Sequence, residues 1–171
     1  ANNAGVIMAP ISINYAQLLV DAAAAQGYEG TLLGSDTWDN NQVAQATVGK
    51  KVTAVVTTFY QEGGDPTFDK GMKEFINSSS DNLANNGGND EVAAVTVMGY
   101  DAYMAAYEAI KKAGAPDAAS ILAAMPSASF EGVSGHIEYD SVGDAKRDVA
   151  YIKTANTSTG SWEFVTIQKV E

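Results

Sequence analysis

A strand, a helix and a second strand follow one another at the start of the chain, and this succession constrains the fold more than any other feature. Residues 6–9 form an apolar run, an amphipathic segment ends at Gly27, and residues 31–33 form a second apolar run. This order predicts two parallel strands joined by a crossover helix. Parallel sheets bind ligands at the carboxyl ends of their strands, where residues 10–14 and 34–40 emerge.

Capping and breaking residues predict where the helices in the front of the chain begin and end. Asn14, with Gln17 at the reciprocal position of a capping box, predicts the start of the crossover helix, and Gly27 predicts its end. Asp65 before Pro66 predicts the start of another helix. The further elements expected here are a short helical turn over residues 43–47, a β-branched strand over 52–60, the second helix over 66–77 and a polar surface loop over 78–90.

The second half of the chain changes from a helical to an alternating period. Residues 92–98 could form a strand by propensity, but the spacing of apolar residues favours a helix, at least from Asp101, which Gly114 closes. Asp117 predicts a shorter helix that ends before Pro126. Three short strands are expected over residues 133–139, 149–155 and 162–170, the last two at hairpin spacing.

The chain is strongly acidic, which bears on its partners. In its 171 residues, Asp and Glu number 21 against 10 Lys and Arg, for a formal charge of −11. This charge repels phosphate backbones and anionic lipid surfaces, so we expect no nucleic-acid partner and no membrane-surface binding. Cationic, zwitterionic and neutral small ligands are not repelled. No apolar run approaches the roughly 20 residues that span a bilayer.

The chain offers little for catalysis. It has no Cys, which excludes disulfides, thiolate nucleophiles and zinc–thiolate sites and leaves the compartment open. Its one His, His136, lies in an alternating strand, and no nucleophile elbow accompanies it. Asp36 and Asp39 share a turn and could hold a metal ion for hydrolysis, but their spacing matches no calcium loop. We therefore expect no catalytic residues, no metal site and no cofactor.

Solute binding is better supported by the two loops at the predicted carboxyl edge. Asp36 places a carboxylate after the second strand, where it can accept hydrogen bonds from an ammonium or hydroxyl group. Trp38 offers an aromatic surface for an apolar or cationic group, and Ser12, in the first loop, offers a hydroxyl to the same crevice. The alternatives stay open: a turn residue for Asp36, a core residue for Trp38 and a solvated loop residue for Ser12.

The N-terminal residues are Ala1, Asn2 and Asn3, with neither an initiator Met nor a signal peptide. Such a start is typical of a processed or truncated product. We therefore expect that a preceding segment, including any signal peptide, has been removed, and that this segment could have carried a targeting signal.

Short motifs occur in one order along nearly the whole chain. They are Val6-Ile7-Met8-Ala9-Pro10, Ala25-Gln26-Gly27-Tyr28, Leu32-Leu33-Gly34-Ser35-Asp36, Thr57-Thr58-Phe59, Asp65-Pro66, Gly99-Tyr100-Asp101-Ala102, Ala109-Ile110-Lys111-Lys112-Ala113-Gly114, Phe130-Glu131-Gly132-Val133-Ser134-Gly135-His136-Ile137 and Gly143-Asp144. This succession resembles the second, C-terminal half of type I periplasmic solute-binding proteins, in the branch that binds branched-chain amino acids and amides. Members of this family are the extracellular receptors of ABC importers.

The resemblance implies an α/β fold, a parallel-sheet α/β sandwich of the type I periplasmic binding protein, present as a partial fragment of about half length. By the path of the family, residues 1–60 and 130–171 belong to the second of two lobes. Residues 61–129 form a helical segment of the first lobe. The helices over 66–77 and 92–113 would then lack their sheet, and their exposed faces could support self-association of the fragment.

The resemblance also implies a function without chemistry. A receptor of this kind closes about a hinge on a small-molecule solute, often an amino acid, and delivers it to the membrane permease of an ABC transporter. It is periplasmic or extracellular, and the missing N-terminal region could anchor it as a lipoprotein. The alternative is the ligand-sensing domain of a regulator or sensor with the same fold.

The same resemblance assigns roles to individual residues. Asp36 matches the position of an acidic or polar ligand contact, often to the amino group of an amino acid, and Ser12 falls in the loop that supplies a second contact. Tyr60 falls near the crossover between the lobes, which implies a hinge or cleft role. Trp38 has no assured counterpart in the family and is kept as a ligand contact for its stacking surface alone. Because the opposite wall of the site is absent, we expect weak solute binding by this chain alone.

Overall fold

The protein is described by a computed structural model that covers residues 4–169. Ala1, Asn2 and Asn3, on which the expectation of a processed N terminus rests, lie outside the described residues. Val170, the last residue of the third predicted tail strand, also lies outside them. Within residues 4–169, none of the helices combines the length and apolar character that crossing a bilayer requires.

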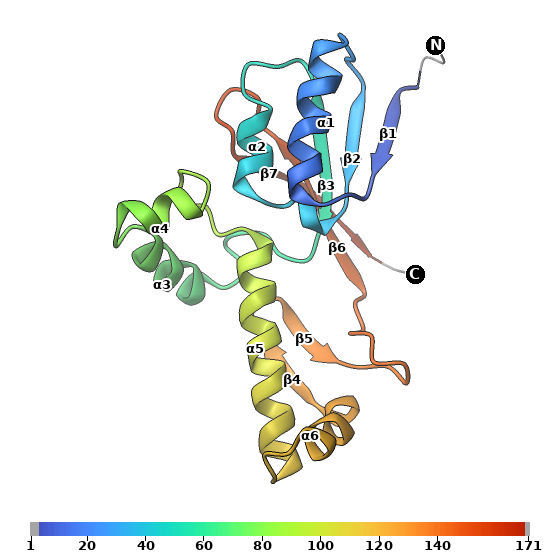
Figure 1. Cartoon of the computed structure of the whole chain (residues 1–171), viewed down its shortest axis with the longest axis vertical. Helices are drawn as coiled ribbons and strands as arrows, with labels where there is room; N and C mark the ends of the chain where they lie inside the picture. The colour runs from blue at the N-terminus through green and yellow to red at the C-terminus, as the bar shows by residue number, and fades with distance from the viewer. Residues whose placement is uncertain (1–3, 170–171) are drawn as a thin grey trace.

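A five-stranded mixed sheet forms the larger body of the molecule (Figure 1). The strands β1 (Val6–Ala9), β2 (Thr31–Gly34) and β3 (Thr53–Thr58) pair in parallel, which confirms the parallel front predicted from their order. The tail adds β6 (Val149–Ala155) and β7 (Trp162–Lys169), both antiparallel, in the sheet order β1-β2-β3-β6-β7. The hairpin predicted for the last two strands is therefore confirmed.

The helices α1 (Ile13–Ala25) and α2 (Asn41–Ala46) lie on one face of this sheet (Figure 1). Helix α1 begins earlier than predicted, because Ser12 is its N-cap and Asn14 lies inside its first turn. The amides of Tyr15 and Ala16 both donate to the Ser12 carbonyl, at 3.0 Å each. The capping box expected from Asn14 was therefore wrong, while the short helical turn predicted after the acidic segment is confirmed as α2.

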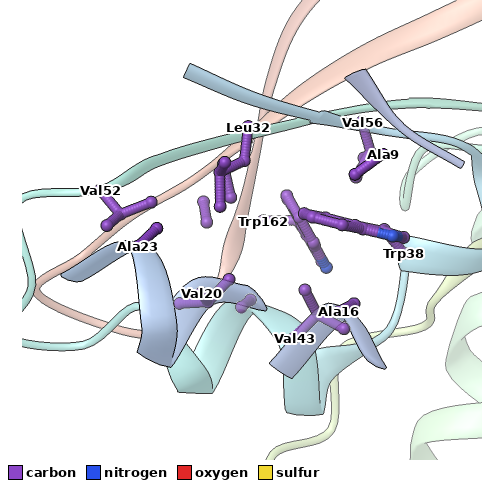
Figure 2. Close-up of a cluster of buried hydrophobic side chains, with 13 residues drawn as sticks. Ala9, Ala16, Val20, Ala23, Leu32, Trp38, Val43, Val52, Val56 and Trp162 are labelled. Carbon is purple, nitrogen blue, oxygen red and sulfur yellow. The ribbon is translucent and has the colours of Figure 1, made fainter. Parts of the chain in front are cut away.

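The core of this body lies between the sheet and the two helices (Figure 2). Alternate residues of the strands point inward, as the twofold period of a strand requires. Both Trp side chains, Trp38 and Trp162, are buried among smaller aliphatic residues. The other fully buried apolar residues of this cluster are Ala16, Val20, Leu32, Val43, Ala44, Val52, Ala54 and Val56.

A second, helical body extends from the sheet along α5 (Ala94–Ala113) (Figure 1). The helix α6 (Ala118–Ala124), the 3-10 turn η2 (Met125–Ser127) and a separate hairpin pack along it. The hairpin consists of β4 (Ser129–Gly132) and β5 (Gly135–Glu138). Two further helices, α3 (Pro66–Ile76) and α4 (Ser80–Asn85), precede α5.

Local capping predicted several of these helices correctly. The Asp65 carboxylate accepts from the amides of Thr67 and Phe68, and the Asp117 carboxylate accepts from the Ser120 amide, each at 3.0 Å. Residues 94–98 are helical, so α5 is longer than its predicted minimum and the strand alternative is excluded. Helix α5 ends at Gly114 with φ of 64°, a conformation that costs glycine little.

Two predictions differ from the structure. The expected loop over residues 78–90 contains α4, because the Ser79 hydroxyl accepts from the Asn82 amide and starts a helical turn. The strand expected over 133–139 is present as β5, but Val133 and Ser134 form a turn that joins it to an additional strand, β4, which the sequence did not predict. This hairpin contacts α5 and pairs with itself, so it does not extend the five-stranded sheet.

Large apolar side chains remain exposed on both bodies. Tyr100, Tyr103, Tyr107 and Ile110 share one helical face of α5 and are 44–69% exposed. On the edge strand β1, Met8 is 72% exposed. The sequence led us to expect the uncovered face of α5, but not the exposed edge at β1.

We expect Leu32→Ala to lower the free energy of unfolding by about 2–5 kcal/mol, because Leu32 is fully buried in the core of the sheet body and truncation leaves a cavity. The matched control is Leu18→Ala on α1, where the side chain is 62% exposed, and its effect should stay within about 0.5 kcal/mol. Urea denaturation followed by circular dichroism measures both. Equal effects of the two substitutions would contradict the packing described.

Candidate functional site

The parallel pairing of β1 and β2 brings two polar loops to the same edge of the sheet. Ala9, the last residue of β1, is paired in register with Gly34, the last residue of β2. The loops that follow therefore leave the sheet side by side, at the carboxyl edge where ligands of such sheets bind. Ser12 in the first loop and Asp36 in the second are both exposed.

A single backbone carbonyl, that of Ile11, ties these loops together. It accepts a hydrogen bond from the Trp38 indole nitrogen at 3.0 Å and another from the Thr37 hydroxyl at 3.1 Å. Residues Asp36–Trp38 form the 3-10 turn η1, and the Trp38 ring packs over Gly34. A Cβ at Gly34 would lie 2.3 Å from the Trp38 ring, so the close approach requires glycine.

The Trp38 side chain belongs to the core and not to the surface of the site. It is 0% exposed and packs with the cluster of Leu32 and Val43 (Figure 2). In this structure its ring offers no face to a solute, so the core alternative holds in place of the stacking role. Its indole N–H fixes the position of η1, which carries Asp36.

The polar groups of Ser12 and Asp36 are open to a ligand. The Ser12 side chain makes no capping hydrogen bond to α1. In the part of the chain that the structure describes, no hydrogen bond or ion pair engages the Asp36 carboxylate, and the residue is exposed. A surface hollow of about 490 Å³ begins nearby at Asn14 and Gln17, but neither Ser12 nor Asp36 lines it. The candidate site is thus an open wall.

Asp39 has a different environment from Asp36, although both lie in the same acidic turn. Its carboxylate is buried and accepts from the Lys153 ammonium at 2.9 Å and from the Thr58 hydroxyl at 2.7 Å. Asp39 and Lys153 are 0% and 1% exposed. The two carboxylates therefore do not form a pair for a metal ion, and no metal-binding cluster of acidic, His or Cys residues occurs within residues 4–169.

Comparisons with known proteins add to this geometry. No family model and no curated protein matches the sequence. Among solved structures, a leucine-binding protein LivK from Thermotoga maritima is 25% identical with a TM-score of 0.73, over 98% of this chain and 45% of that protein. An ABC transporter solute-binding protein from R. palustris, in complex with benzoate, is 16% identical with a TM-score of 0.70, over 95% of this chain and 42% of that one.

A third solved structure, an ABC transporter substrate-binding protein from Desulfitobacterium hafniense, is 20% identical with a TM-score of 0.61. It covers 94% of this chain, which spans 44% of its length. The chain has the α/β fold of type I periplasmic binding proteins, present in part. It spans less than half the length of each of these structures.

In this partial periplasmic binding protein fold, Tyr60 lies directly after β3, in the segment that leads from the sheet body to the helices. It is 2% exposed, and its hydroxyl donates to the Asp69 carboxylate at 2.7 Å and accepts from the Asp65 amide at 3.0 Å. Burial, reinforced by the Asp69 carboxylate, raises the pKa of the Tyr60 phenol. Both capacities of the hydroxyl are used internally, which fits a hinge residue better than a residue that lines the cleft.

A buried carboxylate that the sequence did not single out as a site residue, Asp101 on α5, joins two motifs of the fragment. It accepts from the amides of Val133 and Ser134, at 2.8 and 2.9 Å, and from the Ser134 hydroxyl at 2.5 Å. A Cβ at Gly132 would lie 2.8 Å from Asp101 Oδ1. The sequence signal for this residue was an acid on the apolar, buried face of α5, because a buried carboxylate needs hydrogen-bond partners.

We expect Asp39→Asn to lower the free energy of unfolding by about 3–5 kcal/mol, because it leaves the Lys153 ammonium buried without a counter-charge. Adding Lys153→Met should recover most of the loss. The matched control Asp36→Asn removes an exposed carboxylate of the same turn and should change stability by less than about 0.5 kcal/mol. Chemical denaturation compares the variants, and similar losses for Asp36→Asn and Asp39→Asn would contradict this assignment.

We expect Glu91→Gln to stabilise the protein at neutral pH. Burial is the main cause that raises the pKa of the Glu91 carboxyl, so the folded state favours its protonated form. Keeping this carboxyl ionised at neutral pH therefore lowers the free energy of unfolding. The disadvantage of the native Glu91 therefore shrinks as pH falls through its raised pKa. Denaturation at neutral and acidic pH should show an advantage of the variant that disappears in acid. The exposed control Glu74→Gln should show little change, and a destabilised Glu91→Gln at neutral pH would oppose this reasoning.

Proposed function

We propose that this fragment forms one wall of the solute site of an extracellular receptor for an ABC importer. The observation that carries the proposal is the carboxyl edge of the sheet, where Ser12 and Asp36 present a free hydroxyl and a free carboxylate on loops anchored by Ile11. The solved neighbours support it, since they are a leucine-binding protein and solute- or substrate-binding proteins of ABC transporters.

The chemistry of this wall favours a solute with an ammonium group, such as an amino acid. A carboxylate accepts charge-assisted hydrogen bonds from an ammonium group, and Asp36 has no competing cation among its described contacts. The same charge would repel a carboxylate placed against it, so a purely anionic solute such as benzoate would need a different orientation. The Ser12 hydroxyl can donate to or accept from the polar groups beside the amine.

Hinge closure is the mechanism that this proposal implies. A solute favours the closed form only through contacts that differ between the open and closed states, so both walls must contribute. We assign residues 1–60 and 130–171 to one lobe and 61–129 to the other, with Tyr60 at the crossing between them. The hairpin of β4 and β5 packs on α5, so residues 130–138 lie against the helical lobe, and the chain returns to the sheet only between β5 and β6.

The partners follow from the same proposal. A receptor of this kind carries its solute to a membrane permease and catalyses no reaction, so neither a catalytic residue nor a cofactor is assigned. Its place is the periplasm or the outside of the cell, where a lipid anchor on a preceding segment would hold it near the permease. The exposed tyrosines on α5 would be covered by the other half of the receptor.

We expect residues 1–171 alone to show no saturable heat with leucine or other amino acids below about 1 mM in isothermal titration, because one wall supplies few contacts. A longer protein that contains this segment and the opposite wall should bind one of these solutes tightly. In that protein Asp36→Ala should weaken binding roughly tenfold or more, since hydrogen bonds to charged groups contribute about 1.5–3 kcal/mol.

The matched control is Asp144→Ala, which removes an exposed carboxylate from the tail turn and should leave affinity unchanged. Micromolar binding by the fragment alone would contradict the two-walled site. Unchanged affinity of the longer protein after Asp36→Ala would place the solute elsewhere. A thermal-shift screen of amino acids, amides and small acids on that protein identifies the solute to titrate.

A further inference from the structure

The junction between the sheet body and the helical body contains an arginine with partners on both sides. The sheet body comprises the five-stranded sheet with α1 and α2, and the helical body comprises α5, α6 and the hairpin of β4 and β5. Phe59 lies directly after β3, on the sheet body. Arg147 lies in the returning segment, between Lys146, whose amide donates to the Glu138 carbonyl of β5 at 2.9 Å, and the start of β6. Figure 1 shows the long segment after β5 returning to the sheet through this junction.

The Arg147 guanidinium is hydrogen-bonded to the turn of the hairpin. Its Nη1 donates to the Ser134 carbonyl at 3.0 Å and its Nη2 donates to the Ser134 hydroxyl at 2.9 Å. The same guanidinium lies 5.6 Å from the centroid of the Phe59 ring, in the range of a cation–π contact. A planar guanidinium can make two directed hydrogen bonds and stack at the same time, which an ammonium cannot.

Ser134, which Arg147 contacts, is itself hydrogen-bonded to α5. The buried carboxylate of Asp101 accepts from the amide and hydroxyl of Ser134, at 2.9 and 2.5 Å, and from the Val133 amide. The turn therefore cannot shift along α5 without breaking these bonds. A movement of the helical body relative to the sheet body must instead break or stretch the contacts of Arg147, either with Ser134 or with Phe59.

The segment between α4 and α5 provides a second, separate point of attachment to the sheet body. The Asn41 amide group, at the start of α2, donates to the carbonyls of Asn86 and Glu91, at 2.8 and 3.2 Å. The Trp162 amide donates to the Glu91 carboxylate at 3.3 Å. Asn41 is 2% exposed, so this attachment lies inside the molecule. One attachment just before α5 permits rotation about it, whereas a second at the hairpin turn stops that rotation.

We propose that Arg147 sets the angle between the two bodies. Its hydrogen bonds to Ser134, a residue that Asp101 holds in place, form a contact that we call the latch. The proposal rests on the proposed function in one respect: solute-driven closure would turn about this junction and would have to release or re-form the latch. Nothing in the latch itself requires a solute, so it can be tested without one.

The test uses pairs of spin labels on the chain of residues 1–171. Since the chain has no Cys, two introduced cysteines carry the only labels. Leu18→Cys on α1 and Leu122→Cys on α6 lie on different bodies, at side chains 62% and 71% exposed. Double electron–electron resonance, with labelled chain diluted in unlabelled chain, gives the distribution of distances between the bodies. The pair Leu18→Cys and Val165→Cys lies within the sheet body and reports on its integrity.

In Arg147→Gln the fraction of molecules outside the native distance range should rise roughly tenfold, the factor that about 1.4 kcal/mol of lost restraint represents. Ser134→Ala should give a smaller increase, because the carbonyl contact remains. Arg147→Lys should behave nearly as Arg147→Gln, since it keeps the charge without the two-pronged geometry. Lys51→Met, which removes an exposed cation paired with Glu29 inside the sheet body, should leave the distribution native.

An unchanged distribution between the bodies in both Arg147→Gln and Ser134→Ala, with the pair inside the sheet body also native, overturns the latch. An increase of the same size in Lys51→Met overturns it as well, because general loss of charge would then be the cause. Absence of solute binding in the titrations above would defeat the proposed function and leave this result unaffected.

Discussion

The parallel pairing of β1 with β2 is the constraint on which the candidate site depends. Because Ala9 and Gly34 end their strands in register, the loops that carry Ser12 and Asp36 leave the sheet together. The Ile11 carbonyl then joins the loops through the Trp38 indole and the Thr37 hydroxyl. The Trp38 ring packs inward over Gly34, and Asp36, in the same turn, is exposed. A buried aromatic anchor thus holds an exposed polar group in place.

The ion pair of Asp39 and Lys153 connects this front segment to the tail of the chain. Removing two charges from water is costly, and their attraction offsets that cost only when geometry and further hydrogen bonds are good. Here the Thr58 hydroxyl supplies one further bond to the Asp39 carboxylate. The pair links η1, β3 and β6, and so it fixes the acidic turn against two neighbouring strands. Its value for the site lies in positioning rather than in net stability.

Both bodies present exposed apolar surfaces. The tyrosine face of α5 and the outer face of β1 are apolar and exposed, and the chain spans less than half of each solved neighbour. The open wall formed by Ser12 and Asp36 has the same one-sided character. The proposed receptor would need two walls and a junction that can change angle, and Arg147 lies where the sheet body meets the helical body.

Local sequence determined the order of the elements and most helix ends. Asp65, Asp117 and Gly114 act within one helical turn, so their capping roles were predictable from neighbouring residues. The parallel front and the tail hairpin followed from apolar periods and turn residues, and the family resemblance supplied the fold of which the chain is a fragment. Asp36 and Ser12 were placed at one edge because strand order alone dictates where such loops emerge.

Only the tertiary structure decided what each polar or aromatic side chain contacts. Trp38 and Asp36 share a short turn, yet one is buried and the other exposed, because packing against α1 and α2 selects the inner face. Asp39 finds its counter-charge in Lys153, 114 residues further along the chain, and Asp101 finds its donors in a hairpin that the sequence did not predict. Burial and long-range pairing depend on residues far apart in sequence, which no local pattern contains.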